Sequence, residues 1–228
     1  MKRLLLFATA PLVLAMLLVS AALGPPGTAS AAAPLTGSGS FSFAHAEFSS
    51  EAGGVQTTAI VDVQDVAFSD PGGAFEGSFL TVFASRFDPG DPNNPNDDQL
   101  DLLQGNAELA PDEFRVSADG SSATLSAVVT MCSQISPDCF NGSVNLSWTR
   151  TGQLQTFSGK AIVRAGGNCR IHDTFSDSHG AASATGTVSI GTTNFTPDPS
   201  DLAEIAISSS RQRFTGDCSF LFPPPPGP

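Results

Sequence analysis

The residues best suited to chemistry lie in one short segment, residues 172–179. It contains two histidines, two carboxylates and two serines, namely His172, His179, Asp173, Asp177, Ser176 and Ser178. A histidine and a carboxylate beside a serine hydroxyl suggest a nucleophile with its general acid-base partner. Neighbouring side chains of an extended strand point to opposite faces, however, so the spacing does not bring these groups together. We therefore expect polar strand positions here, as for the third histidine, His45, and predict no catalytic residue.

A second polar segment, residues 88–101, concentrates carboxylates and amides. Calcium takes six to eight oxygen ligands, and the Asp91-x-Asn93 spacing fits the start of a calcium-binding loop. The glycine and the closing glutamate of an EF-hand are absent, and Pro, Asn and Asp are also the usual residues of a solvated turn. A plain loop is the main prediction, with calcium as the one cofactor left open. The calcium ligands would be Asp91, Asn93, Asn96, Asp97 and Asp98.

The four cysteines form an even set, which in an exported chain predicts disulfides. Three pairings are possible, and we favour Cys132 with Cys139 because residues 133–138 have the composition of a loop between strands. That choice leaves Cys169 to pair with Cys218. The competing interpretation is zinc, since Cys169-x-x-His172 resembles half of a zinc site, but the sequence has no second pair of this kind.

The N-terminus predicts export. Lys2 and Arg3 precede an apolar run over residues 4–23, and a stretch of small residues ends at Ala33. This is the pattern of a helical signal peptide over residues 1–33, removed after an A-x-A triplet. An uncleaved anchor is the alternative, although Pro11 interrupts the apolar run. We expect a secreted or extracytoplasmic protein without stable membrane insertion after cleavage.

Charge and composition limit the partners. The net charge is −12, and loss of two N-terminal cations leaves 8 Lys and Arg against 22 Asp and Glu, or −14. Such a chain repels phosphate backbones and anionic lipid overall, which excludes nucleic acid as an expected partner. The chain has 17 Phe, one Trp and no Tyr. Carbohydrate-binding surfaces favour Tyr and Trp, so the composition also disfavours a sugar-binding module.

Alternation with a period of two runs through the chain. Phe41, Phe43 and His45 share one parity. The pattern over residues 57–63 changes parity at Val66, which predicts a bulge near residues 64–65. Trp148 alternates with apolar neighbours, which favours a core position over an exposed ligand platform. The other predicted strands are residues 78–87, 99–104, 113–117, 123–131, 143–149, 154–165, 169–175, 182–190 and 202–214.

Turn residues separate these segments at hairpin spacing, and no segment keeps a helical period. Residues 201–207 are ambiguous between a strand and one or two helical turns. The sequence predicts an all-β protein, a single antiparallel β-sandwich or barrel-like domain of about ten strands over residues 41–220. A flexible linker over residues 34–40 precedes the domain, and a Pro-rich tail over residues 221–228 follows it.

Residues 146–152, 184–188 and 191–197 resemble segments of an uncharacterised group of exported bacterial β-rich proteins. The likeness extends over residues 78–210. It implies an all-β fold and export. No activity is attached to the group, so the resemblance implies no site residues.

The leading functional hypothesis is an exported noncatalytic β-domain, a binding or envelope-associated module with an unknown extracellular partner. It predicts an exposed apolar patch or a long unpaired sheet edge. One alternative is an extracellular hydrolase or lyase, which requires a pocket where titratable side chains converge. The other is a calcium-dependent adhesive or matrix protein.

Overall fold

The computed structural model describes residues 35–52, 55–88, 99–191, 193–195 and 202–222. In this part of the chain eleven strands form a single antiparallel sheet, and one short 3-10 helix follows the last strand. Within it, no helix has the length and apolar character needed to span a bilayer. The strands are β1 (Thr36–Ala52), β2 (Val55–Asp70), β3 (Gly73–Asp88), β4 (Gln99–Leu109), β5 (Phe114–Val116), β6 (Ser122–Ser133), β7 (Cys139–Arg150), β8 (Gln155–Gly166), β9 (Cys169–Ile190), β10 (Thr193–Phe195) and β11 (Ala203–Thr215), and the helix is η2 (Ser219–Leu221).

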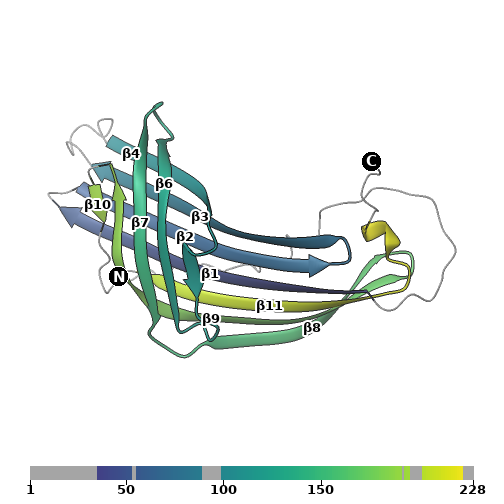
Figure 1. Ribbon diagram of the computed structural model, residues 1–228. Coiled ribbons are helices and arrows are strands. Elements are labelled where there is room, and N and C mark those ends of the chain that lie inside the picture. The colour runs from purple at the N-terminus through teal and green to yellow at the C-terminus, as the bar shows by residue number, and fades with distance from the viewer. Residues whose placement is uncertain (1–34, 53–54, 89–98, 192, 196–201, 223–228) are drawn as a thin grey trace.

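Eight strands close into a ring. Its order is β1-β2-β3-β4-β6-β7-β9-β11, and β11 pairs again with β1. In Figure 1, β6 and β7 cross in front of the long strands at a steep angle. The ring closes between β4 and β6 through only three residue pairs, the central one being Gln104 with Cys132. The predicted all-β antiparallel class is confirmed, in its barrel-like form.

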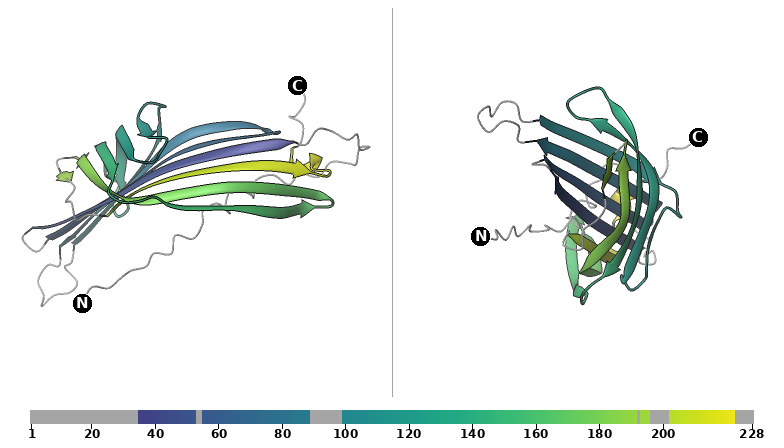
Figure 2. Two further views of the ribbon diagram at one scale, coloured as in Figure 1. Left: turned by 90° about the horizontal axis from the view of Figure 1, so that it is seen from below. Right: turned by 90° about the vertical axis from the view of Figure 1, so that its left-hand side faces the viewer.

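Five of these strands continue past the ring and, joined by β8, form an open sheet of six strands, which we call the tongue. Its order is β8-β9-β11-β1-β2-β3, and Figure 2 shows it extending well beyond β6 and β7. One edge is β8, and the other is the start of β3, which pairs with β4 only from Ser78 onward. Neither edge has a pairing partner on its outer side among the described residues. Besides β8, the tongue comprises residues 36–43, 64–70, 73–77, 169–181 and 206–215.

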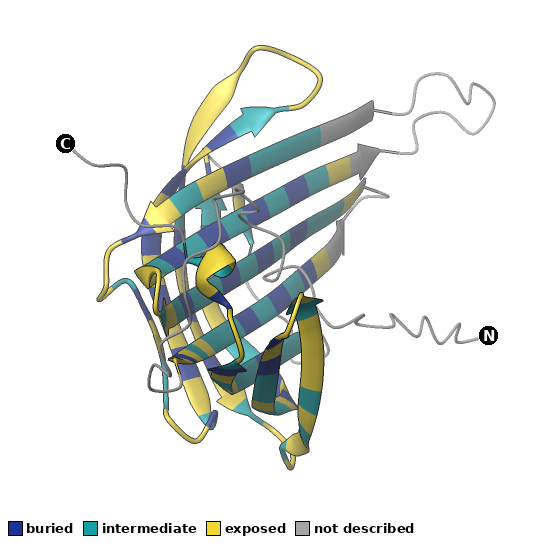
Figure 3. Ribbon diagram, turned by 90° about the vertical axis from the view of Figure 1, so that its right-hand side faces the viewer, coloured by how far each residue is buried: buried dark blue, intermediate teal, exposed yellow. Residues whose placement is uncertain are grey.

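The core fills the ring. We call the sheet face that points into the ring the inner face, and its side chains alternate with exposed ones along each strand, as the stripes in Figure 3 show. Trp148 is 1% exposed and donates its Nε1–H to the carbonyl of His45 at 2.8 Å, which confirms it as a core residue. The other large side chains of the ring that are fully buried are Leu80, Met131, Ile205, Val61, Val63, Val82, Val129, Val144 and Val188.

The opposite, outer face of the tongue is lined by phenylalanine rings that lie on glycines. A Cβ built at Gly77 would stand 2.9 Å from the ring of Phe79 and 3.1 Å from that of Phe75. One built at Gly159 would stand 2.7 Å from the ring of Phe175. Glycine therefore lets the rings lie flat on the backbone, which supports strands that no second layer covers.

The two disulfides are those expected from the sequence, Cys132 with Cys139 and Cys169 with Cys218. The second lies at the tip of the tongue, on the outer face, in a small separate core. There Phe214 meets Phe222 edge to face, with ring centroids 5.0 Å apart. This core fixes the segment after β11 against the tongue.

Three local expectations were wrong. The pairing of β2 with β1 and β3 is unbroken across residues 64–65, so no bulge lies there. Val66 is instead buried on the outer face, while Val61 and Val63 are buried on the inner face inside the ring. Residues 169–175 and 182–190 belong to the single strand β9. Most of the expected linker, from Thr36 onward, is strand. The segment that was ambiguous between strand and helical turns is strand β11 from Ala203, which confirms the strand predicted over residues 202–214.

Closure of the ring requires a residue without a side chain at position 105, where the chain has glycine. A Cβ at this position would stand 2.5 Å from Met131 Sδ and 2.7 Å from the carbonyl oxygen of Thr130. Gly105→Ala should therefore lower the free energy of unfolding by about 1–3 kcal/mol, the usual cost of overpacking, as measured by urea denaturation. Gly152→Ala is the control, since nothing lies within 4 Å of that Cβ. Equal losses in both variants would contradict this account of closure.

Candidate anion-binding site

The inner face changes character where the strands leave the ring. Aliphatic side chains fill it inside the ring, but on the tongue it carries small hydroxyl side chains. A hollow of about 820 Å³ lies over this part and is lined by residues from all six tongue strands. Because no second sheet covers it, the hollow opens to solvent. Its inner-face hydroxyl groups come from Ser38, Ser40, Ser69, Ser158, Thr174, Ser176 and Ser209.

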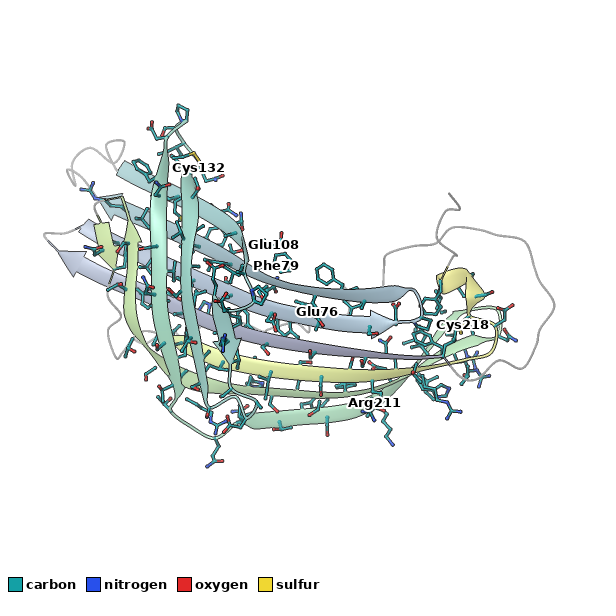
Figure 4. The ribbon with its side chains drawn as sticks, viewed as in Figure 1. Glu76, Phe79, Glu108, Cys132, Arg211 and Cys218 are labelled. Carbon is teal, nitrogen blue, oxygen red and sulfur yellow. A yellow bond between two sulfur atoms is a disulfide. The ribbon has the colours of Figure 1, made fainter. Side chains whose placement is uncertain are left out.

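Basic side chains gather on the inner face toward the free end of the tongue, where Figure 4 places Arg211 and Cys218. The registers of β8, β9 and β11 define three adjacent rows on this face, which together we call the basic grid. The rows are Lys160, Thr174 and Arg211; then Ile162, His172 and Arg213; then Arg164, Arg170 and Thr215.

The grid concentrates charge of one sign. It holds five of the eight Lys and Arg residues that follow residue 33, and all five are exposed. With strands about 4.8 Å apart and about 3.3 Å per residue, they occupy an area of roughly 10 by 13 Å. None of the five forms an ion pair or a side-chain hydrogen bond with a described residue.

Arg164 and Arg170 lie directly opposite one another on neighbouring strands. Like charges in this arrangement destabilise a sheet. A second hollow, of about 430 Å³, lies at this row and is lined by both arginines and by Asn168 and Thr215. Guanidinium groups bind phosphate, sulfate and carboxylate through paired hydrogen bonds, so an anion placed here would remove the repulsion.

The residues considered for catalysis in segment 172–179 do not converge on one point. Alternation places His172, Ser176 and Ser178 on the inner face, with Asp173, Asp177 and His179 on the outer face. Asp177 accepts a hydrogen bond from the hydroxyl of Ser208. Burial raises the pKa of Asp173, whose Oδ1 has no hydrogen-bond partner among the described residues. His172 belongs to the basic grid, where its Nε2 lies 3.2 Å from Thr215 Oγ1.

The metal expectations have different outcomes. The zinc interpretation is wrong, because Cys169 is in a disulfide with Cys218. The expected calcium ligands, Asp91, Asn93, Asn96, Asp97 and Asp98, lie outside the described residues, so calcium binding stays a prediction. In the part of the chain that the structure describes, no three His, Cys, Asp or Glu residues are grouped to hold a metal ion.

The remaining histidine lies on the outside of the ring. His45 Nδ1 is 2.7 Å from Asp62 Oδ1, in a directly paired position of β1 and β2. This hydrogen bond raises the pKa of His45 above 6.5, against the opposing effect of burial, and the charges of Glu47 and Glu204 act in the same direction as the bond. The pair is partly exposed and lies away from both hollows, so we assign it a structural role.

No family model and no curated protein matches this chain. Among solved structures the chain is similar to a candidate AttH protein from Nitrosomonas europaea, with 10% identity and a TM-score of 0.28 over 78% of this chain and 52% of that one. It thus spans about half the length of that protein. It is also similar to the enduracididine biosynthesis enzyme MppR, solved with pyruvate, with 10% identity and a TM-score of 0.23 over 87% of this chain and 91% of that chain. Neither likeness is close enough to support an argument about function.

The basic grid was missed from the sequence, although a signal was present. Apart from Lys2 and Arg3, the chain has eight Lys and Arg, and five fall in the two segments 160–170 and 211–213. Within each strand the cations share one parity, which places them on one face. What the sequence did not reveal is that β11 pairs with β9, which brings the two segments together.

Relief of charge repulsion can be measured without a ligand. Replacing Arg164 with Gln removes the repulsion with Arg170, so we expect the melting temperature of the ligand-free protein to rise by about 1–3 °C at low salt. The gain should shrink at high salt because ions screen exposed charges. Arg115→Gln, an exposed change on β5, is the matched control. A lower melting temperature for Arg164→Gln than for the control would show that these cations do not repel.

The histidine pair predicts a pH dependence of stability. The folded-state pKa of His45 lies above its ordinary value near 6.5. The stabilisation it provides is therefore complete below about pH 6.5 and is lost as the pH rises through the raised pKa. We expect the advantage of the wild type over His45→Gln in urea denaturation to be larger at pH 5.5 than at pH 8.5. His179→Gln, on the exposed outer face of β9, should show no such trend, and a parallel trend would reject the assignment.

Proposed function

We propose that this protein is an exported, noncatalytic binding domain that holds a multivalent anion on the basic grid of its tongue. One observation carries the proposal. In a chain with 22 acidic residues, five of the few basic residues face one solvent-exposed area, and none of them forms an ion pair with a described residue. Arranging them there costs stability, as the opposed Arg164 and Arg170 illustrate. A bound anion accounts for that arrangement.

The chemistry of the surroundings defines the ligand class. Ser and Thr hydroxyls in the adjoining hollow donate hydrogen bonds to the same oxygens that guanidinium groups bind. The cations spread over roughly 10 by 13 Å, which is wider than one phosphate or sulfate group. The ligand therefore carries several phosphate, sulfate or carboxylate groups.

Two further features favour binding over catalysis. His172 shares the inner face with Ser176, but four residues of extended strand, about 13 Å, separate them, while His179 and both carboxylates lie on the outer face, so these groups do not form a nucleophile with its base. The hollow is lined mainly by hydroxyl groups, with Lys160, Arg211 and Glu76 as its charged residues. Glu76 lies at its far side on β3. A hydrolase or lyase would need titratable groups that converge on one point.

Titration with inorganic tripolyphosphate tests the proposal. Isothermal titration calorimetry of the purified protein at about 50 mM salt should show binding that weakens as salt increases. Arg170→Gln, in the centre of the third row, should weaken the affinity by about tenfold, because it removes a charge-assisted contact. Arg115→Gln removes the same charge elsewhere and should retain the wild-type affinity.

Two results would reject the proposal. One is the absence of any heat of binding at low salt, together with an unchanged melting temperature in excess tripolyphosphate. The other is an equal loss of affinity in Arg170→Gln and Arg115→Gln, which would mean that only net charge matters and that the grid is not a site.

A further inference from the structure

We infer that the multivalent anion of the basic grid is the surface of a lipid bilayer rich in acidic headgroups, on which the tongue docks tip first. The inference rests on the proposed function and names the source of its anionic groups. The evidence is that exposed apolar side chains lie among the cations and beside them, an arrangement that suits the boundary between headgroups and acyl chains.

The clearest apolar residue is Ile162, which is 64% exposed. It lies on the inner face of β8 between Lys160 and Arg164, and its row continues with His172 and Arg213. An isoleucine surrounded by cations contributes nothing to a soluble anion. At a bilayer it can enter the interface while the longer basic side chains reach the phosphates.

Two more exposed apolar side chains lie at the same end of the tongue. Leu35, 40% exposed, accepts a hydrogen bond through its carbonyl from the N–H of Phe214, next to Arg213 in the chain. Phe220, 36% exposed, lies against the turn between β8 and β9, where its ring stands 3.6 Å from a Cβ built at Gly166. The tip thus presents apolar and basic groups together.

The tip is held rigid before it meets a surface. The disulfide between Cys169 and Cys218 joins β9 to the segment that carries Phe220, and Phe214 packs on Phe222 beneath it. Docking therefore orders little chain, so less of the interaction energy is lost to conformational entropy. Exposed apolar groups on a fixed support are also costly in water, which favours a partner that covers them.

Charge outside the grid sets the orientation. The eight Lys and Arg after residue 33 include five in the grid, which leaves three against 22 acidic residues. An acidic bilayer repels that remainder and attracts the tip, so the ring stays away from the surface. The chain as a whole is acidic, but its tip is basic, as the membrane-facing surface of a peripheral membrane protein is.

Vesicle co-sedimentation tests the inference. The purified protein should bind phosphatidylcholine vesicles that contain phosphatidylglycerol and should not bind vesicles of phosphatidylcholine alone. Ile162→Ser, which retains every charge, should weaken binding to the acidic vesicles by about tenfold through loss of apolar burial. The same variant should keep the wild-type affinity for tripolyphosphate. Val128→Ser is the matched control, since Val128 is 70% exposed on β6 in the ring.

The outcomes separate the two proposals. If tripolyphosphate binds but acidic vesicles do not, or if Ile162→Ser binds vesicles as Val128→Ser does, the membrane inference is wrong and the anion site stands. If neither probe binds, both proposals fail. Vesicle binding that Ile162→Ser weakens without a change in tripolyphosphate affinity supports the bilayer as the ligand.

Discussion

The structure depends on one constraint: strand pairing runs without interruption from the ring into the tongue. Five strands, β1, β2, β3, β9 and β11, take part in both. The registers of these strands do not shift. On each strand, the side chains that face the core in the ring and those that face the hollow in the tongue are therefore an even number of residues apart. Ile205 and Arg211 on β11 are such a pair. A slip of one residue would turn the cations of the tongue to the outer face and the aliphatic side chains of the ring outward.

The same constraint explains how the tongue is stabilised. With its inner face committed to polar side chains, the tongue has no large core on that side. Its apolar contacts lie on the outer face instead, where Val66 is buried, Phe75 and Phe79 cover Gly77, and Phe175 covers Gly159. The buried face of β2 therefore changes from the inner face at Val63, in the ring, to the outer face at Val66, in the tongue. This change resembles a bulge in the sequence pattern, although the backbone is regular.

Much of this fold could be predicted from the sequence, because hairpin turns and period-two alternation are local signals. They defined most strands within a few residues, and the loop between Cys132 and Cys139 defined one disulfide. What could not be predicted was long-range pairing. Closure of the ring through β4 and β6, and the contact of β11 with β9, depend on residues tens of positions apart, and Gly105 matters only because Met131 lies across from it. The basic grid belongs to this second class, since Arg170 and Arg213 become neighbours only in the folded sheet.

The distribution of charge links the fold to the proposed activity. Acidic residues outnumber basic ones by 22 to 10 in the chain, so random placement in the fold would leave most cations close to a carboxylate. The cations of the grid lie beside one another and beside Thr36, Ser38, Ile162, His172, Thr174 and Thr215. Such a surface is unfavourable in isolation, and the most exposed strand, β8, carries part of it. A protein whose stability comes mainly from the ring can tolerate that local cost, because the tongue contributes little to the core. In the proposed membrane contact, a partner that is both anionic and able to cover apolar surface would relieve the charge repulsion and bury Ile162 together. The tongue would then favour that combination over either property alone.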